Sequence, residues 1–87
     1  MARYELRFKT SVAKDLRGIA KADVKRIIAR INELSGEQRP AGAEKLAGHD
    51  LYRIRQGVYR IVYRIEDAAV VVEVIKIAHR REVYRAL

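Results

Sequence analysis

Residues 51–77 constrain the fold most, because they read as three strands joined by very short turns. Residues 51–56 and 58–65 alternate charged and apolar side chains, which is the period-two pattern of a half-buried strand. Residues 69–77 are nearly all apolar, as is typical of a strand that is buried on both faces. Gly57 lies in one of the short intervals between the strands, where a tight turn is expected. These residues therefore predict an antiparallel meander.

The first half of the chain predicts one strand and two helices. Residues 2–9 alternate apolar and charged side chains, whereas residues 12–19 and 24–34 carry apolar side chains at helical spacing. Residues 36–49 contain three of the five glycines and the only proline, so we expect a long loop there. The predicted class is α+β, in the order β-α-α-β-β-β, with an antiparallel sheet and an N-terminal helical hairpin packed on one face. Residues 1–87 are expected to form a single domain.

Charge and composition narrow the class of partner. The 19 basic and 11 acidic residues give a net charge of +8, which favours a polyanion such as nucleic acid, or an acidic protein. The sequence has no cysteine, so disulfides and thiolate metal sites are excluded. It has no apolar run of about 18 residues and no signal-peptide pattern at its start, so we expect no membrane partner and a cytoplasmic location.

Four arginines are expected to gather on one surface of the meander. Arg53 and Arg55 share one face of their strand, and Arg60 and Arg64 share one face of the next. The apolar side chains of the same strands must face the helices, so the guanidinium groups lie on the opposite side. Guanidinium groups at strand spacing repel one another unless an anion lies among them, and their planar fork suits phosphate. A solvated sheet face with scattered counter-charges is the alternative.

The available side chains favour chemistry without a metal or other cofactor. The acidic residues are dispersed, and His49 and His79 lie in different segments, so no metal-ligand cluster is expected. RNA supplies its own nucleophile, the 2′-hydroxyl. A protein must then accept that proton, protonate the departing 5′-oxygen and stabilise the phosphoryl charge. Arginine suits the last task and is a poor base.

The basic tail offers acid and base groups. Histidine is the side-chain type that titrates nearest neutrality, which makes His79 one candidate. Tyr84 is the other, because the neighbouring Arg80, Arg81 and Arg85 would lower the pKa of its phenol. Tyr84 is also able to stack on a base. Two structural roles remain open: Tyr84 as a side chain packed on a sheet edge, and His79 as a residue that ends the last strand.

Three stretches of the sequence resemble the RelE/ParE superfamily of toxins from toxin–antitoxin pairs. They are Lys45-Leu46-x-Gly48, the run from Leu51 to Tyr63 that reads LYRIRQGVYRIVY, and His79-Arg80-Arg81-Glu82-Val83-Tyr84. The N-terminal strand and helices are similar as well, so the resemblance covers nearly the whole chain. It implies a RelE-like, microbial-RNase-like fold.

The resemblance also implies an activity. Enzymes of the RelE branch cleave messenger RNA in the ribosomal A site, without metal, by attack of the 2′-hydroxyl, and so inhibit translation. The matching catalytic positions are Arg53, Arg55, Arg60, Arg80 and Tyr84, and we expect RNA contacts from Lys45, Arg64, His79, Arg81 and Arg85. Two of the strand positions are often lysine in RelE-like enzymes and are arginine here.

Partners and alternatives follow from the same resemblance. The implied partners are the ribosome with its mRNA and a RelB-like antitoxin with an acidic segment that folds on binding. The ParE branch instead poisons DNA gyrase and generally lacks this basic and tyrosine set, so Arg60 and Tyr84 favour the RelE branch. A nucleic-acid-binding relative without catalysis is the third alternative.

Overall fold

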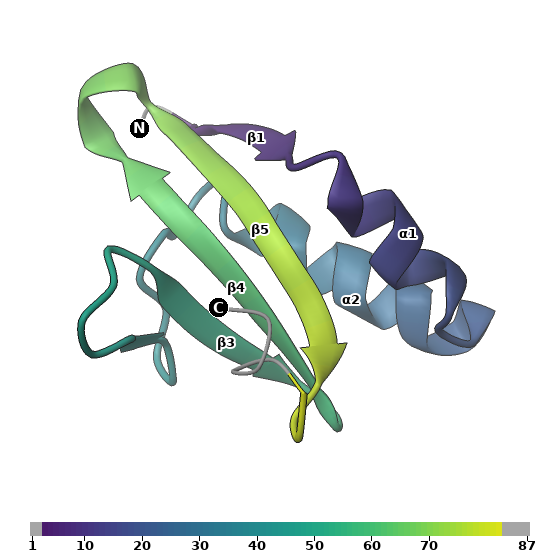
Figure 1. The fold of residues 1–87 in the computed structure, drawn as a ribbon. Coiled ribbons are helices and arrows are strands. Elements are labelled where there is room, and N and C mark those ends of the chain that lie inside the picture. Colours follow the sequence, from purple (N-terminus) through teal and green to yellow (C-terminus); the bar gives the residue numbers. More distant parts are fainter. Residues whose placement is uncertain (1–2, 83–87) are drawn as a thin grey trace.

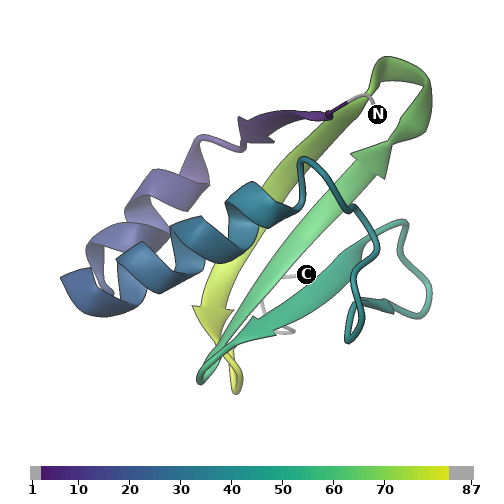
Figure 2. The same ribbon diagram turned by 180° about the vertical axis from the view of Figure 1, so that it is seen from behind.

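Five strands form one sheet in the order β1-β5-β4-β3-β2, and two helices lie on one of its faces (Figures 1 and 2). The structure is a computed structural model that describes residues 3–82. Its elements are β1 (Glu5–Phe8), α1 (Ser11–Arg17), α2 (Lys21–Glu33), β2 (Glu44–Lys45), β3 (Tyr52–Gln56), β4 (Tyr59–Glu66), the 3₁₀ turn η1 (Asp67–Ala69) and β5 (Val71–His79). Neither of the described α-helices has the length and apolar character needed to cross a membrane. The predicted α+β class and helical hairpin are confirmed.

Strands β3, β4 and β5 pair antiparallel in the order in which they follow along the chain, which confirms the predicted meander. Gly57 adopts φ 60° in the two-residue turn between β3 and β4, a left-handed conformation that glycine adopts without steric cost. The turn between β4 and β5 is longer than expected, because η1 and Val70 occupy residues 67–70. Val70 has φ 56° there, which is unusual for a β-branched residue.

Two features of the sheet differ from the expectation. The sheet is mixed, because β1 pairs parallel to β5 at one edge, and the antiparallel prediction holds only for β2 to β5. The loop predicted for residues 36–49 contains the two-residue strand β2, which pairs with β3 at the other edge. Side-chain periodicity does not encode which strands pair or in which direction, so neither feature was readable from the pattern alone.

The main core lies between the sheet and the helices. Val12 of α1, Ile27 and Ile31 of α2 and the meander residues Ile54 and Ile61 are all buried in it. The strand tyrosines also face this core, as the period-two alternation of their strands requires. Tyr63 is fully buried, and three tyrosines pack against the core while partly buried: Tyr4, Tyr52 and Tyr59.

Strand β5 contains a bulge, and a carboxylate from α1 covers part of its exposed edge. Val62 pairs with Lys76 and the next residue of β4 pairs with Val74, so Ile75 has no partner on β4. Beyond the end of β1, Asp15 covers the exposed edge of β5. Its carboxylate accepts hydrogen bonds from the Ile77 N–H (3.1 Å) and the Lys76 Nζ (2.8 Å). The side chain of Asp15 is only 10% exposed, so this contact anchors α1 to β5.

Candidate functional site

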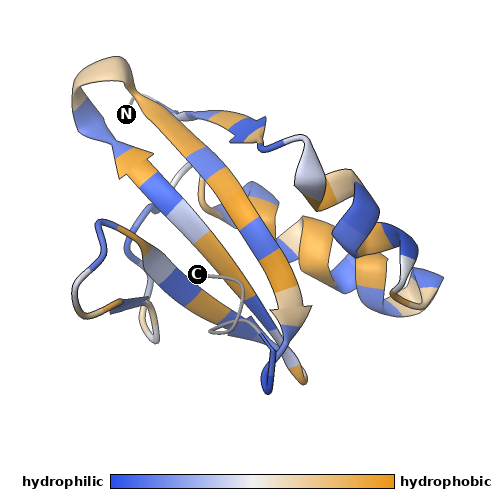
Figure 3. Cartoon of the chain, in the orientation of Figure 1, coloured by the Kyte–Doolittle hydropathy of each residue, from blue (hydrophilic) through white to orange (hydrophobic). Residues whose placement is uncertain are grey.

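The strand register places four arginines on the face of the sheet that the helices leave uncovered. Arg55 lies directly opposite Arg60, and Arg53 lies opposite Val62. Arg64, two residues beyond Val62, shares that face because alternate residues of a strand point the same way. We call these four side chains, Arg53, Arg55, Arg60 and Arg64, the arginine face. Figure 3 shows the resulting alternation of hydrophilic and hydrophobic bands along β3 and β4.

The arginine face lies beside a small apolar cluster rather than on an entirely solvated surface. Val62 is fully buried although it points away from the helices. It packs with four residues of the loop and strands: Leu46, Leu51, Ile75 and Ala78. The open face of the sheet therefore carries a small apolar cluster beside its arginines.

Arg53 and Arg64 form ion pairs with carboxylates on the same face. Arg53 pairs with Glu44, and the Arg53 side chain is only 11% exposed. Arg64 pairs with Glu73 at 3.4 Å, at the other end of the face. Among residues 3–82, Arg55 has neither an ion pair nor a hydrogen bond through its side chain. Within residues 3–82, Glu44 and Glu73 are thus the carboxylate partners of two arginines on a face with four guanidinium groups, which leaves a local excess of positive charge.

Glu44 is the functional candidate that the sequence analysis missed. It lies opposite Arg53 in the β2–β3 pair, whereas its neighbour Lys45 lies opposite Tyr52 and so belongs to the other face. The sequence predicted an RNA contact from Lys45, which this pairing places on the side of the sheet away from the arginines. The pairing of β2 with β3 instead places the Glu44 carboxylate on the arginine face. Only the pairing of residue 44 with residue 53 reveals this.

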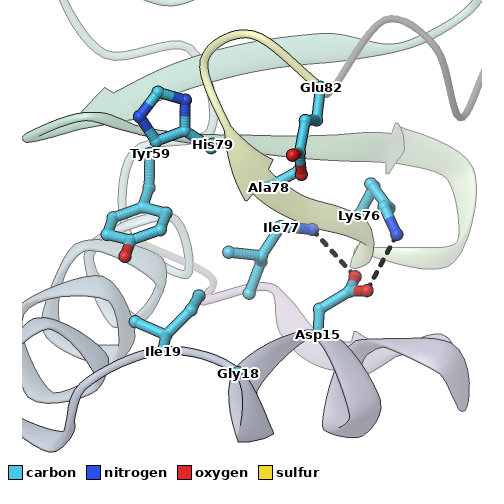
Figure 4. A pocket seen from close by; sticks show the side chains of 9 residues that line it. All are labelled: Asp15, Gly18, Ile19, Tyr59, Lys76, Ile77, Ala78, His79 and Glu82. Atoms are coloured by element: carbon cyan, nitrogen blue, oxygen red, sulfur yellow. Dashed lines mark hydrogen bonds and ion pairs between the residues drawn. The ribbon is translucent and has the colours of Figure 1, made fainter.

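His79 also lies away from the arginine face. It pairs with Tyr59 across β4 and β5, and the two rings meet edge to face with centroids 6.3 Å apart. Both rings line a pocket of about 500 Å³ on the helix side, whose other walls include Ile19 and Glu82 (Figure 4). Tyr59 packs against the main core, so the sheet itself separates His79 from Arg55 and Arg60.

The basic tail begins next to the turn between β3 and β4. The Arg80 N–H donates to the Val58 carbonyl at 2.8 Å, and the Arg81 N–H donates to Nδ1 of His79 at 3.3 Å. Both arginine side chains are exposed. Tyr84 and Arg85 lie outside the described residues, so their place beside the arginines stays a prediction.

A polar network holds the loop before β2 against the sheet. Arg39 donates to the Tyr52 hydroxyl (3.2 Å) and to Asp67 (3.1 Å), and Tyr4 donates to the same carboxylate at 2.6 Å. These hydrogen bonds, first from Tyr4 and then from Arg39, lower the pKa of Asp67 below its ordinary value. They also raise the pKa of Tyr4, whose neutral hydroxyl is the donor.

Tyr63 also holds the loop before β2, from inside the core. Its hydroxyl donates to the Gln38 carbonyl at 2.8 Å, and its ring stacks on Tyr52 with centroids 5.8 Å apart. Burial raises the pKa of Tyr63 to about 12, so the phenol is neutral at physiological pH. These contacts hold residues 38 and 39 against the sheet, shortly before β2 begins.

The described residues offer no group of three or more His, Asp or Glu side chains close enough together to hold a metal ion.

The sequence matches, over residues 6–84, the family described as the ParE toxin of the type II toxin–antitoxin system parDE. The chain belongs to this toxin family. Membership confirms the predicted RelE/ParE superfamily and makes the protein a toxin of a toxin–antitoxin pair.

Known relatives of this toxin carry RelE-type names. Toxin RelG of Mycobacterium tuberculosis is 33% identical over 90 residues, which cover 94% of this chain and 97% of RelG. A mutant of the E. coli toxin RelE in the free state has a TM-score of 0.78 and 28% identity, covering 97% of this chain and 90% of that one. The toxin–antitoxin complex RelE–RelB of Pyrococcus horikoshii gives a TM-score of 0.77 at 27% identity, covering 90% and 96%.

Proposed function

We propose that this toxin is a metal-independent, ribosome-dependent endoribonuclease of the RelE-like branch, which cleaves mRNA and so inhibits translation. The observation that carries the proposal is the direct opposition of Arg55 and Arg60 on the face that no described helix covers. Like charges that face each other across two strands destabilise a sheet. A bound phosphodiester would offset that repulsion and receive two-pronged hydrogen bonds from the guanidinium groups.

In the proposed reaction the RNA 2′-oxygen forms a bond to the adjacent phosphorus while the bond from phosphorus to the 5′-oxygen breaks. The products are a 2′,3′-cyclic phosphate and a 5′-hydroxyl. Arg53, Arg55 and Arg60 stabilise the charge that builds up on the phosphoryl oxygens. The tail supplies Arg80 and the predicted proton donor Tyr84.

The proton of the 2′-hydroxyl needs an acceptor, and arginine is too weak a base to serve. Glu44 is the acceptor we propose, because its carboxylate lies on the arginine face and is held by Arg53. Of the residues predicted to contact RNA, we keep Arg64 on this face and Arg81 in the tail. Lys45 and His79 lie on the other face of the sheet, so they would meet only RNA that passes round it.

 

The antitoxin partner follows from family membership and from the solved relatives. Four of the similar structures are complexes of RelE-type toxins with RelB-type antitoxins or an antitoxin peptide, from P. horikoshii, Methanococcus jannaschii and E. coli. We therefore expect this toxin to bind a RelB-like antitoxin in the cytoplasm. The net charge of +8 favours an acidic partner segment.

A gyrase poison is the second candidate, because the matching family is described as the ParE toxin of parDE. That function requires no RNA cleavage. It predicts a DNA-damage response on expression, with messages left intact.

Growth arrest on induction tests the proposal. We expect Arg60→Ala and Tyr84→Ala to relieve the arrest while the proteins remain folded. Arg26→Ala is the matched control, because Arg26 is an exposed arginine of α2 whose carboxylate partner, Asp23, lies one turn away. Full arrest by both Arg60→Ala and Tyr84→Ala would contradict the proposal, and a DNA-damage response with uncut messages would support the gyrase alternative.

A further inference from the structure

A pocket of about 500 Å³ lies on the helix side of the sheet, near the end of β5 and the turn from α1 to α2. The half-buried rings of Tyr59 and His79 form one side of it, and Glu82 stands on the other side with the ion pair of Asp15 and Lys76 (Figure 4). The volume lies within the range of about 300–1,000 Å³ that is usual for sites that bind small molecules. The arginine face is on the opposite side of the sheet, so the proposed RNA cleavage leaves this pocket without a role.

Three polar groups that line this pocket retain hydrogen-bonding capacity. Among residues 3–82, the Tyr59 hydroxyl and the Glu82 carboxylate have no hydrogen-bond or ion-pair partner. Lys76 donates one of its three N–H groups to Asp15 at 2.8 Å and keeps the other two. The pocket therefore combines two aromatic rings with available acceptors and donors, which is the combination that binds a planar, polar ring such as a nucleobase.

A carboxylate opposite aromatic rings selects among the nucleobases. An ionised carboxylate only accepts hydrogen bonds, so it needs two neighbouring N–H groups to use both of its oxygens. Guanine presents two such donors, N1–H and N2–H, next to the O6 acceptor on its Watson–Crick edge. Adenine, cytosine and uracil each set at least one acceptor beside a single donor on that edge, so each would oppose an acceptor to the carboxylate. Glu82 is complementary to the two donors of guanine, and the spare N–H groups of Lys76 are complementary to its O6.

We propose that this pocket binds the guanine base of a nucleotide, with the rings of Tyr59 and His79 against the base and its Watson–Crick edge toward Glu82 and Lys76. Aromatic rings hold a base through stacking, and the carboxylate and the ammonium group decide which base is accepted. Guanine binding here requires no RNA cleavage, because the pocket and the arginine face lie on opposite sides of the sheet.

Cations for the phosphate of such a nucleotide lie nearby in the chain. Arg80 and Arg81 directly follow His79, and both are exposed. Guanidinium groups are well suited to phosphate. The same base and phosphate are offered by a free guanine nucleotide and by a guanosine within an RNA strand, and the experiment separates these two sources.

The first test titrates the full-length toxin with GMP, IMP and AMP in a calorimeter. IMP lacks the 2-amino group of GMP, and AMP presents a ring acceptor in place of N1–H. We expect GMP to bind about 10-fold more tightly than IMP, the effect of one hydrogen bond to a charged group, and AMP to bind more weakly still. Glu82→Gln should remove most of the difference between GMP and IMP, because the second N–H then has no acceptor.

Glu66→Gln is the matched control. Glu66 is an exposed glutamate at the far end of β4, and it forms no ion pair with another described residue. We expect this variant to bind the three nucleotides in the wild-type order. Glu82 is exposed as well, so both variants are expected to fold. Equal affinity of the wild type for GMP and AMP would overturn the proposal, as would a difference between GMP and IMP that Glu82→Gln leaves unchanged.

A second titration identifies the source of the base. It uses short RNA strands with 2′-O-methyl riboses, which resist cleavage by 2′-hydroxyl attack, and which carry either one guanine or one adenine at the same position. Tighter binding of the guanine strand than of GMP, with a preference that Glu82→Gln abolishes, would support the pocket as a site for a base of RNA. Binding of GMP without a guanine preference among the strands would support it as a site for a free nucleotide. Failure of both GMP and the guanine strand to bind would overturn the pocket and leave the proposed cleavage of mRNA intact.

Discussion

Arg55 and Arg60 lie directly opposite each other in the β3–β4 pair and share the face that the helices leave open. Directly opposed like charges reduce the stability of a sheet. We expect Arg55→Gln to raise the midpoint temperature of thermal unfolding in low salt. The difference from the wild type should shrink when salt or inorganic phosphate is added, because anions screen or bind the wild-type pair. Arg7→Gln, at an exposed arginine of β1, is the control, and a lower transition for Arg55→Gln in low salt would contradict this interpretation.

Glu44 and Glu73 form a matched pair of tests for the proton acceptor. Each carboxylate is ion-paired with an arginine of the same face, but Glu44 pairs with Arg53, a proposed catalytic residue, and Glu73 pairs with Arg64 at the far end. We expect Glu44→Gln to slow cleavage of mRNA on purified translating ribosomes by about 10²–10⁴-fold, the usual contribution of a general base. RNA affinity should stay the same or rise, because a negative charge has been removed. Glu73→Gln should cleave normally; equal loss in both variants would indicate a structural role.

Val70 has a strained, left-handed backbone conformation that a single substitution should relieve. Its φ of 56° and ψ of 48° are left-handed, which costs a residue with a side chain about 1–2 kcal/mol. Val70→Gly removes that cost and loses part of the gain to the greater freedom of glycine in the unfolded chain. We expect a net stabilisation of about 0.5–1 kcal/mol, seen as a thermal transition a few degrees higher. Val58→Gly, at an exposed valine without positive φ, should not stabilise.

Because Asp67 accepts hydrogen bonds from Tyr4 and Arg39, we expect the stability of the folded toxin to depend on pH under acidic conditions. Because the folded-state pKa of Asp67 is lowered, its contribution is present above the pKa of the unfolded chain and is lost as pH falls through the folded value. Asp67→Asn should therefore be less stable than the wild type at neutral pH, with the difference vanishing toward about pH 2. Unfolding of both proteins by a chemical denaturant, repeated from neutral to acidic pH, measures this difference in stability. A difference that does not change with pH would show that the carboxylate charge is not responsible.

Sequence pattern predicted the meander and the shared face of its arginines because both depend on a two-residue period within each strand. It also assigned Tyr63 to the core for the same reason. What it missed depends on contacts between segments distant in sequence. The pairing of Glu44 with Arg53 arises only when β2 forms, and the placement of His79 opposite Tyr59 follows from the register of β4 with β5.

The β5 bulge illustrates the same limit. Val74 and Ile77 both contribute to the core although they are three residues apart, which a regular strand would forbid. The extra residue, Ile75, shifts the phase of the strand between them. Nothing in the run of apolar side chains marks where that shift occurs.

The central claim is that the arginine face cleaves messenger RNA during translation, and mapping of RNA 5′ ends after induction tests it most directly. The toxin and its Arg60→Ala variant would be induced in parallel at equal protein levels. The account predicts new 5′-hydroxyl ends confined to the translated parts of messages, present with the wild type and absent with Arg60→Ala. Messages that stay intact while the wild type arrests growth, or cuts that Arg60→Ala makes equally well, would contradict it.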